Sequence, residues 1–368
     1  MTLTASAQTP SMPVARPVAL EIQNLGKRLG GNTILDGLNL QVHEGEIVAL
    51  LGPSGSGKTT LLRCISGLEA PDAGTLTIAG REMYNAGRRL NVPPEGRNLG
   101  LVFQSYALWP HRTVAQNVAF GLEQRRVPKA ELTERVQAVL DQLGLGALAG
   151  RYPGQLSGGQ QQRVSLARAF VTEPSVLLLD EPLSNLDAKL REHARVWLRE
   201  ALNASGKTAI FVTHDQSEAM AVADRVAILR GGRLTQYDAP EQVYAHPNSL
   251  FVADFIGNPN ILEASNPRPD GHLTRVDVYG TSLVGVGVPD PELNGQTRVV
   301  LRQEALLPGA PGQPNTLSAR RVSSVFLGPV WEHWVEIHGQ RLRFHTPGRL
   351  TDEQVHIHIP ANQLLIFY

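Results

Sequence analysis

Cysteine is nearly absent from this sequence: Cys64 is the only one in 368 residues. The chain therefore cannot form an internal disulfide framework, and this composition suits a reducing compartment. An excess of charge of one sign is also lacking, because 34 Lys and Arg residues balance 34 Asp and Glu residues. A neutral chain lacks the basic surface of a dedicated nucleic-acid binder, so we expect no nucleic-acid partner.

Long apolar runs are absent as well. No stretch approaches the ~18 apolar residues of a membrane-spanning helix, so we expect a cytoplasmic chain that works at a membrane only through another protein. The N-terminal segment also lacks the charged and apolar regions of a secretory signal. Its Ala, Ser, Thr and Pro content predicts a disordered leader over residues 1–18.

Two different patterns follow the leader. Over residues 19–245, short apolar runs alternate with amphipathic segments, which predicts an α/β domain with a parallel sheet covered by helices. Strands are expected at residues 46–51, 98–103, 175–180 and 208–213, and helices at 113–124, 131–143 and 188–202. Beyond that domain, prolines and glycines punctuate short alternating runs, and no lysine follows Lys207. This pattern predicts a small β-barrel domain over residues 246–368.

A phosphate-binding loop is the most specific local motif. Residues 52–59, GPSGSGKT, fit the pattern G-x-x-x-x-G-K-[ST] between an apolar strand and a helix. Glycines let backbone N–H groups wrap closely around phosphates, and the helix start adds its positive end. We expect Lys58 to reach the β- and γ-phosphates and Thr59 to ligate Mg²⁺. The predicted nucleotide-binding residues of this loop are Gly52, Pro53, Ser54, Gly55, Ser56, Gly57, Lys58, Thr59 and Thr60.

A second glycine-rich motif begins another helix. Residues 156–160 read LSGGQ, and Ser157 and Gln160 have the spacing of a capping box. By itself this spacing indicates only an ordinary capped helix. The two glycines between them also admit close approach by another molecule, so the motifs that accompany LSGGQ decide between the two interpretations.

Three further motifs follow in order. The run VLLLDE ends in Asp180 and Glu181, the turn SNLD spans residues 184–187, and the strand TAIFVT leads to His214. Together with LVFQ, which ends at Gln104, and the two glycine-rich motifs, they resemble the ATP-binding cassette (ABC) family throughout the first domain. The resemblance implies a P-loop NTPase fold with a helical subdomain at about residues 105–165 and ATP as the nucleotide.

The resemblance also implies a role for each motif residue. Glu181 polarises the attacking water, and His214 contacts the γ-phosphate and holds the water in line. Phosphoryl transfer depends mainly on such placement and on charge neutralisation. The implied catalytic residues are Glu181, His214 and Lys58, and the implied Mg²⁺ ligands are Thr59, Gln104 and Asp180.

In this family the LSGGQ helix caps the γ-phosphate that a second chain holds. One phosphate loop and one signature per chain therefore imply a homodimer with two shared sites. The residues implied at the partner's nucleotide are Ser157, Gly158, Gly159 and Gln160, and those implied at the dimer interface are Ser184 and Asp187. At the adenine position the chain departs from the family, because Leu29 offers an apolar face without aromatic stacking.

Two functional classes remain open: an ATPase subunit of a membrane importer, and a soluble ABC ATPase that acts on nucleic acid or ribosomes. The second class usually carries paired cassettes, coiled-coil insertions or zinc-binding cysteines, which are absent from this sequence. The importer interpretation implies two permease subunits, an external solute-binding protein and a place at the cytoplasmic face of the inner membrane. The residues expected to line the groove for a permease helix are Tyr106, Leu108 and Trp109.

The C-terminal β region resembles the OB-like (TOBE-type) domain of importer ATPases for sugars, polyamines, iron(III), sulfate and phosphonates. The segments that carry this likeness are LRQEAL near residue 301 and VSSVFLGPVWEHWVEIHGQ near residue 322. Within that branch, the cassette most resembles the importers for iron(III), polyamines and phosphonates. We expect iron(III) as the solute, with polyamine, phosphonate or sugar as alternatives.

Two features have competing interpretations. Cys64, one helical turn after the phosphate loop, is either a small buried residue or a redox brake on nucleotide binding. His356 and His358 alternate along a predicted strand and so share one face. That face is either solvated or part of a metal or pH-sensing site. The histidines that could complete such a site are His333, His338 and His345.

Overall fold

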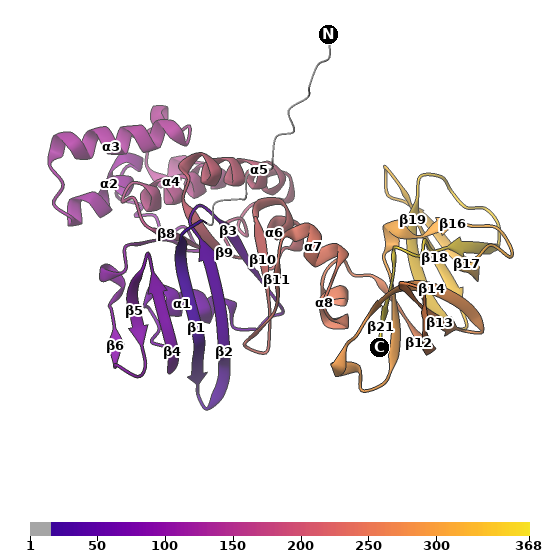
Figure 1. Cartoon of the computed structure of the whole chain (residues 1–368). Helices are drawn as coiled ribbons and strands as arrows, with labels where there is room; N and C mark the ends of the chain where they lie inside the picture. The colour runs from indigo at the N-terminus through magenta and orange to yellow at the C-terminus, as the bar shows by residue number, and fades with distance from the viewer. Residues whose placement is uncertain (1–15) are drawn as a thin grey trace, which may run out of the picture. The chain divides into compact units, whose positions relative to one another are not determined.

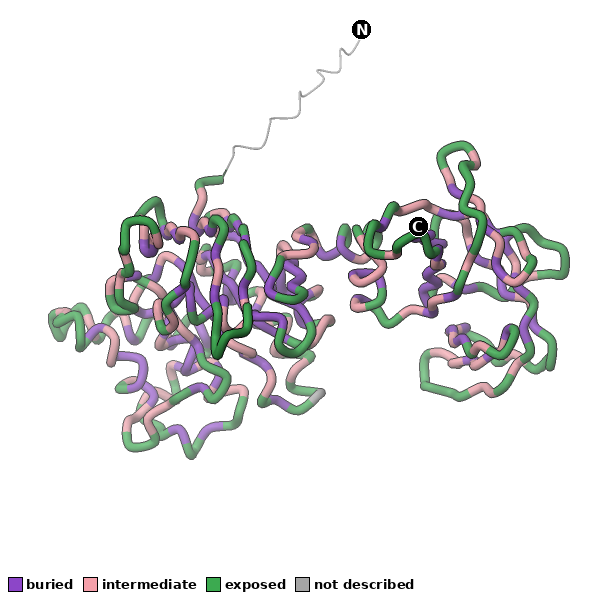
Figure 2. Tube along the Cα trace, turned by 90° about the horizontal axis from the view of Figure 1, so that it is seen from below, coloured by how far each residue is buried: buried purple, intermediate pink, exposed green. Residues whose placement is uncertain are grey.

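The computed structural model describes residues 16–368, so most of the predicted leader lies outside the described residues. Val18 already begins the first strand. The chain divides into two compact units, Met1–Leu234 and Thr235–Tyr368 (Figure 1). Figure 2 shows buried and exposed residues alternating along much of the chain of each unit.

A mainly parallel sheet forms the centre of the first unit. Its strands are β3 (Ile47–Leu51), β7 (Leu99–Val102), β8 (Val176–Asp180), β9 (Thr208–Val212), β10 (Arg225–Arg230) and β11 (Arg233–Asp238), and β11 continues past the end of this unit at Leu234. The strand order is β11-β10-β3-β9-β8-β7, and the neighbours from β10 to β7 pair in parallel. The β3 and β9 strands are buried along their whole length because apolar residues cover both faces. The four predicted strands are confirmed.

A second, antiparallel sheet of the first unit was not predicted. It consists of β1 (Val18–Leu29), β2 (Asn32–His43), β4 (Ala73–Ile78), β5 (Arg81–Asn85) and β6 (Leu90–Asn91), in the order β2-β1-β4-β5-β6. The pairing of β1 with β2 shifts register at four places. Each bulge breaks the two-residue alternation of buried and exposed side chains. The period on which a sequence-based strand prediction depends is therefore lost.

Helices cover the sheets of the first unit. They are α1 (Lys58–Ser66), α2 (Val114–Gln124), α3 (Lys129–Gln142), α4 (Gly158–Phe170), α5 (Ala188–Ser205) and α6 (Gln216–Val222). Helix α1 packs against strands of both sheets, whereas α2, α3 and α4 pack on one another (Figure 1). The three predicted helices are confirmed. No helix within residues 16–368 is long and apolar enough to cross a membrane.

The second unit contains two short helices and ten strands. They are α7 (Pro240–Ala245), α8 (Leu250–Phe255), β12 (Asn260–Asp270), β13 (Leu273–Val278), β14 (Thr281–Val288), β15 (Thr297–Leu301), β16 (Leu307–Pro308), β17 (Thr316–Phe326), β18 (Trp331–Ile337), β19 (Gln340–Thr346), β20 (Gln354–His358) and β21 (Leu364–Phe367). A closed barrel has the order β12-β13-β14-β21-β15, and a second sheet has the order β16-β20-β17-β18-β19. Leu262 and Val299 of the barrel share one core with Val335 and Phe344 of the second sheet. The predicted barrel is confirmed, and the second sheet is an addition to it.

Candidate functional site

The phosphate loop connects the buried strand β3 to helix α1. Two of its glycines have no room for a side chain. A Cβ at Gly52 would lie 2.3 Å from the Leu229 carbonyl oxygen, and one at Gly57 would lie 2.8 Å from that of Ile34. Gly57 also has a φ of 101°, a conformation that favours glycine. The loop is therefore fixed by backbone against backbone, with Ser54 and Gly55 exposed and Thr59 and Thr60 half-buried.

Lys58, the first residue of α1, spans this loop. Its Nζ donates to the carbonyl oxygens of Gly52 and Pro53 at 2.7 and 2.9 Å, and it lies 3.4 Å from the Ser56 hydroxyl. Burial lowers the pKa of Lys58, and the negative charge of Glu181 opposes that shift. The amine is thus within electrostatic reach of Glu181. The amine now donates to neutral carbonyl oxygens. A phosphate chain, whose oxygens carry full negative charge, is a stronger acceptor and can replace them.

The two carboxylates lie where strand β8 ends. Burial raises the pKa of Asp180, and the adjacent charge of Glu181 raises it further, against the opposing effect of Arg63. The Glu181 carboxylate accepts a hydrogen bond from Gln104 Nε2 at 2.7 Å and lies 3.3 Å from His214 Nδ1. Its backbone has a φ of 46°, a conformation that its surroundings must hold in a non-glycine residue. The structure thus brings together three predicted residues from separate strand ends.

The loop that carries Gln104 is tied to helix α4. The Gln104 carbonyl oxygen accepts a hydrogen bond from Asn185 Nδ2 at 2.5 Å. Arg168 of α4 donates to the carbonyl oxygens of Tyr106 and Ala107, at 2.7 and 2.6 Å. The helix that starts with LSGGQ is therefore connected to the residue that contacts Glu181. The sequence prediction missed Arg168 and Asn185, although Asn185 lies inside the SNLD turn.

The predicted capping box at the start of α4 is confirmed. The Ser157 hydroxyl accepts from the Gln160 N–H at 3.3 Å, and Gln160 Oε1 accepts from the Ser157 N–H at 2.9 Å. Ser157 and Gly158 are exposed, and a Cβ at Gly159 would meet nothing within 4 Å. Within the described part of the chain, no hydrogen bond or ion pair joins this helix tip to the phosphate loop. The tip is open to a second molecule.

The SNLD turn connects Glu181 to helix α5. The Ser184 hydroxyl donates to the Glu181 carbonyl oxygen at 3.0 Å. Asp187 accepts from the Leu190 N–H at 2.9 Å and so caps α5. Both predicted residues therefore have structural contacts within their own chain, and the turn is hydrogen-bonded to the backbone of Glu181.

Leu29 is the last residue of β1, and it is 41% exposed. The hairpin to β2 follows directly, and Ile34 of β2 abuts the phosphate loop at Gly57. The structure thus places an exposed apolar side chain in the hairpin beside the phosphate loop.

The three residues predicted for the permease groove differ in exposure. Leu108 and Trp109 are half-buried, and the Trp109 ring lies 4.5 Å from that of Phe120. The Arg112 guanidinium lies over both rings. Tyr106 is only 6% exposed, and burial raises its pKa. Tyr106 is therefore the least accessible of the three, and its place in a permease groove stays a prediction.

Cys64 is fully buried in helix α1, and burial raises the pKa of its thiol to about 12. A thiol that stays protonated at neutral pH and is shielded from solvent lacks the reactivity of a redox switch. The structure therefore favours the buried-residue interpretation over the redox brake.

The C-terminal histidines do not form a metal site. His356 and His358 lie half-buried on one face of β20, as the alternation predicts. His333 is instead fully buried, with its two ring nitrogens 2.8 Å from the hydroxyls of Ser324 and Thr346. Within residues 16–368, no three His, Cys, Asp or Glu side chains are grouped to hold one metal ion. The hypothesis of a metal site is wrong, since His333 lies on the buried face of β18 with Val335, whereas His356 and His358 share the half-buried face of β20.

A buried carboxylate that the sequence prediction missed lies close to His214. Glu218 of α6 is 3% exposed, and its Oε2 accepts from the Thr213 hydroxyl at 2.8 Å. The other oxygen, Oε1, has no hydrogen-bond partner among the described residues. Burial raises the pKa of Glu218 to about 7, although the Thr213 hydrogen bond opposes the shift.

This carboxyl group makes stability depend on pH. Because its pKa rises from 4.5 to about 7 on folding, the folded chain binds the extra proton between these values. The stabilisation is complete below pH 4.5 and is lost as the pH rises to about 7. Glu218→Gln stays neutral throughout and does not lose this stability. As the pH rises from 4.5 to about 7, the free energy of unfolding of the variant should therefore increase relative to that of the parent by on the order of 3 kcal/mol. Urea unfolding at several pH values measures this, and parallel curves for the two proteins would contradict it.

Residues 35–184 match the ABC transporter family. The spermidine/putrescine import ATP-binding protein PotA of Pseudomonas aeruginosa is 44% identical over 90% of this chain and 93% of its own length. The sulfate/thiosulfate import ATP-binding protein CysA of Thermosynechococcus vestitus is 41% identical over 95% and 96%. The Fe(3+) ions import ATP-binding protein FbpC of Escherichia coli is 42% identical over 88% and 89%.

Two solved structures share the fold of part of the chain. One is cbiO1 from Clostridium perfringens, part of the ABC transporter complex cbiONQ, with a TM-score of 0.56 and 30% identity over 63% of this chain and 92% of that chain. The other is an ATP-binding cassette solved as a dimer in a post-hydrolysis state with ADP and Pi, with a TM-score of 0.51 and 31% identity over 60% and 98%. Because relatives of more than 40% identity span most of its length, this chain belongs to the ABC transporter family, among its import ATP-binding proteins.

Proposed function

We propose that this import ATPase hydrolyses ATP at two shared sites of a homodimer, with Glu181 as the catalytic carboxylate. The observation that carries the proposal is the position of Glu181 between Gln104 and His214 at the end of β8. A carboxylate held from two sides can polarise a water molecule in a fixed direction. Phosphoryl transfer depends mainly on such positioning and on electrostatic stabilisation.

The phosphate loop supplies the complementary positive charge. Lys58 already donates to the loop carbonyls that a bound triphosphate would displace, and it binds the β- and γ-phosphates in our proposal. His214 contacts the γ-phosphate and holds the water beside Glu181. Leu29 covers one face of the base. These assignments place the β- and γ-phosphates against groups of the chain.

The oxygen donors at this end of the sheet fit Mg²⁺, which prefers oxygen ligands and retains several waters in NTPase sites. Burial raises the pKa of Asp180, and repulsion by the adjacent Glu181 carboxylate raises it further. A divalent cation would relieve that repulsion. We assign Thr59, Gln104 and Asp180 as the protein ligands. When bound, the ion would neutralise negative charge on the phosphates.

The homodimer completes each site in our proposal. The tip of α4 is exposed, and its capping box occupies the N–H groups of Ser157 and Gln160 but not those of the two glycines between them. A Cβ at Gly159 would meet nothing within 4 Å, so the tip suits an anion that approaches from outside the chain. Ser157, Gly158, Gly159 and Gln160 of one chain thus cap the γ-phosphate held by the other. The dimeric relative with ADP and Pi supports this arrangement. ATP favours the closed dimer because only that state surrounds the γ-phosphate from both sides.

We further propose that the dimer binds two permease subunits at the cytoplasmic face of the inner membrane, and that an external solute-binding protein delivers the solute. Leu108 and Trp109, which are half-buried, are the more accessible of the three residues predicted to line the groove for a permease helix. The proposed domain limits are 19–245 for the cassette, with its helical subdomain at about 105–165, and 246–368 for the β domain.

The solute is the least constrained part of the proposal. The names of relatives with 41% to 44% identity specify a polyamine, sulfate or thiosulfate, and Fe(3+). Similar identity to importers of different solutes indicates that the ATPase itself does not determine the solute. Iron(III) remains our prediction, to be compared directly with polyamine, phosphonate and sugar.

The proposal is tested by purifying the chain together with its permease pair in lipid nanodiscs. We expect the loaded solute-binding protein of one solute class to stimulate ATP hydrolysis, because closure of the ATPase dimer and transport of the solute are steps of the same cycle. The same binding protein without solute is the control. Stimulation by nucleic acid or ribosomes, with no response to any binding protein, would instead favour the soluble ABC ATPase.

A further inference from the structure

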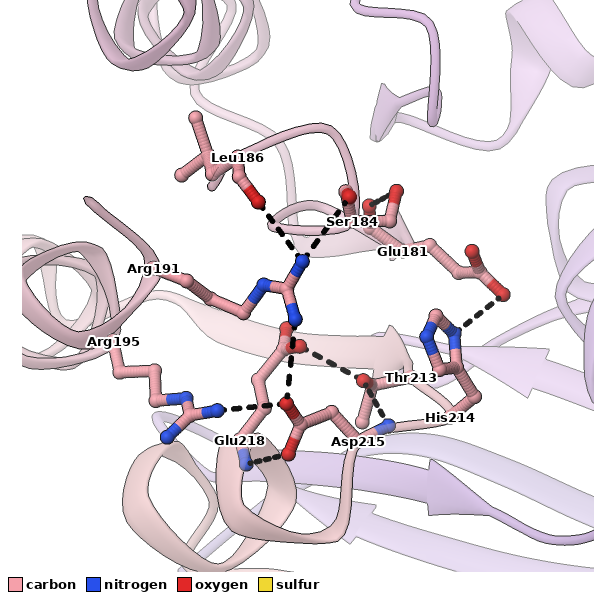
Figure 3. A network of polar contacts seen from close by, with 9 residues as sticks. All are labelled: Glu181, Ser184, Leu186, Arg191, Arg195, Thr213, His214, Asp215 and Glu218. Atoms are coloured by element: carbon pink, nitrogen blue, oxygen red, sulfur yellow. Dashed lines mark hydrogen bonds and ion pairs between the residues drawn. The ribbon is translucent and has the colours of Figure 1, made fainter. Parts of the chain in front are cut away.

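Arg191 of α5 links the SNLD turn to the loop that carries His214. Its Nη2 donates to the Leu186 carbonyl oxygen at 2.9 Å and lies 3.5 Å from that of Ser184. Its Nη1 lies 3.9 Å from Asp215 Oδ2. Figure 3 shows the guanidinium between the two segments, with carbonyl groups on one side and the carboxylate on the other.

Asp215 is fixed by further contacts. Its Oδ2 accepts from Arg195 at 2.7 Å, and its Oδ1 accepts from the Glu218 N–H at 3.1 Å. Burial alone would raise the pKa of Asp215, but the hydrogen bonds of α6 and Arg195 outweigh it and lower the pKa. The Asp215 N–H in turn donates to the Thr213 hydroxyl at 3.0 Å. The segment on both sides of His214 is therefore held by charged and hydrogen-bonded groups.

Both ends of this bridge touch Glu181. The Ser184 hydroxyl bonds the Glu181 carbonyl oxygen, and His214 lies against the Glu181 carboxylate (Figure 3). The contacts form a closed circuit from Glu181 through Ser184, Arg191 and Asp215 to His214. A displacement of the turn therefore changes the position of His214 relative to the carboxylate.

From this circuit we infer that Arg191 is a positioning residue, which transmits movement of the SNLD turn at the dimer interface to His214 and Glu181. The inference rests on the proposed roles of those two residues. A planar guanidinium suits the task because it presents donors in two directions at once. A lysine amine is a single point of charge and cannot contact the turn and Asp215 together.

Helix α5 offers a matched control in Arg199. This residue also donates to two carbonyl oxygens, those of Val222 and Ala223 at 2.8 and 3.0 Å, and to the Asp224 carboxylate at 3.1 Å. Its partners are at the end of α6, away from the circuit. Replacing either arginine removes the same kind of contacts from the same helix.

The experiment compares Arg191→Gln, Arg191→Lys and Arg199→Gln in the full chain. We expect Arg191→Gln to lower kcat by on the order of 10- to 100-fold, since small misplacements of reacting groups have effects of this size. The Kd for trinitrophenyl-ATP should stay unchanged, because the phosphate loop is intact. Arg191→Lys should stay as slow as Arg191→Gln, and Arg199→Gln should keep kcat within about twofold of the parent.

Three results would overturn the inference: equal loss of kcat in the Arg191 and Arg199 variants, full recovery with lysine, or an unchanged kcat in Arg191→Gln. Thermal unfolding of all variants separates a folding defect from a positioning defect. Failure of the underlying mechanism is distinguished by Glu181→Gln. If that variant loses hydrolysis while Arg191→Gln does not, only the inference about Arg191 fails.

Discussion

Replacing Glu181 with glutamine is expected to lower the rate of ATP hydrolysis by on the order of 10²- to 10⁴-fold, the usual contribution of a general base. Glutamine has the shape of glutamate and still accepts the hydrogen bond from Gln104, but it cannot take a proton from water. The repulsion between Glu181 and Asp180 also disappears, so the fold should not be weakened. ATP binding by the phosphate loop is expected to remain, because Lys58 is unchanged.

Phosphate release and the Kd for trinitrophenyl-ATP measure the two halves of this prediction. Gel filtration with ATP adds a third observation, because a dimer that binds but does not hydrolyse ATP should accumulate. Glu192→Gln is the matched control, since Glu192 is an exposed residue of α5 that has no role in the site we propose. Turnover within about twofold of the parent in Glu181→Gln would contradict the assigned role.

Local patterns predicted the parts of the site that depend on neighbours in sequence. The capping box of Ser157 and Gln160 and the strand that ends at Asp180 follow from spacing and burial alone, and both are confirmed. The proximity of Gln104, Glu181 and His214 came only with the family resemblance, because no local pattern reports which strand ends are neighbours. The parallel order of β7, β8 and β9 supplies that information.

Tertiary contacts explain what the sequence could not reveal. Arg191 and Arg199 have the same local setting on α5, and only the fold places one against the SNLD turn and the other against the end of α6. No local pattern marks Tyr106 as more buried than its exposed neighbours, yet a left-handed backbone at residues 106 and 107 turns it inward. Bulges in β1 likewise erase the alternation that would have revealed the antiparallel sheet.

Mixed dimers should restore activity that neither inactive parent possesses. Lys58→Ala removes the charge that binds the phosphates, and Gly159→Asp places a carboxylate at the open tip of α4. Because a Cβ at Gly159 meets nothing within 4 Å and Asp suits a helix start, this variant should fold normally. Its added charge would repel the γ-phosphate of the partner chain. Each variant alone is therefore expected to be inactive at both sites.

In a mixed dimer the two defects fall on the same site, and the other site has an intact phosphate loop and an intact signature. Random exchange makes half of the dimers mixed, each with one working site, so the mixture should recover about a quarter of the parent rate if the sites act independently. Lys58→Ala mixed with Glu181→Gln is the control, because both defects lie on the side of the phosphate loop and every site stays impaired. No recovery in the test mixture, after exchange is verified, would show that each chain completes its own site. Recovery in the control would show that Lys58 and Glu181 of different chains act at one site, which would also contradict the proposed arrangement.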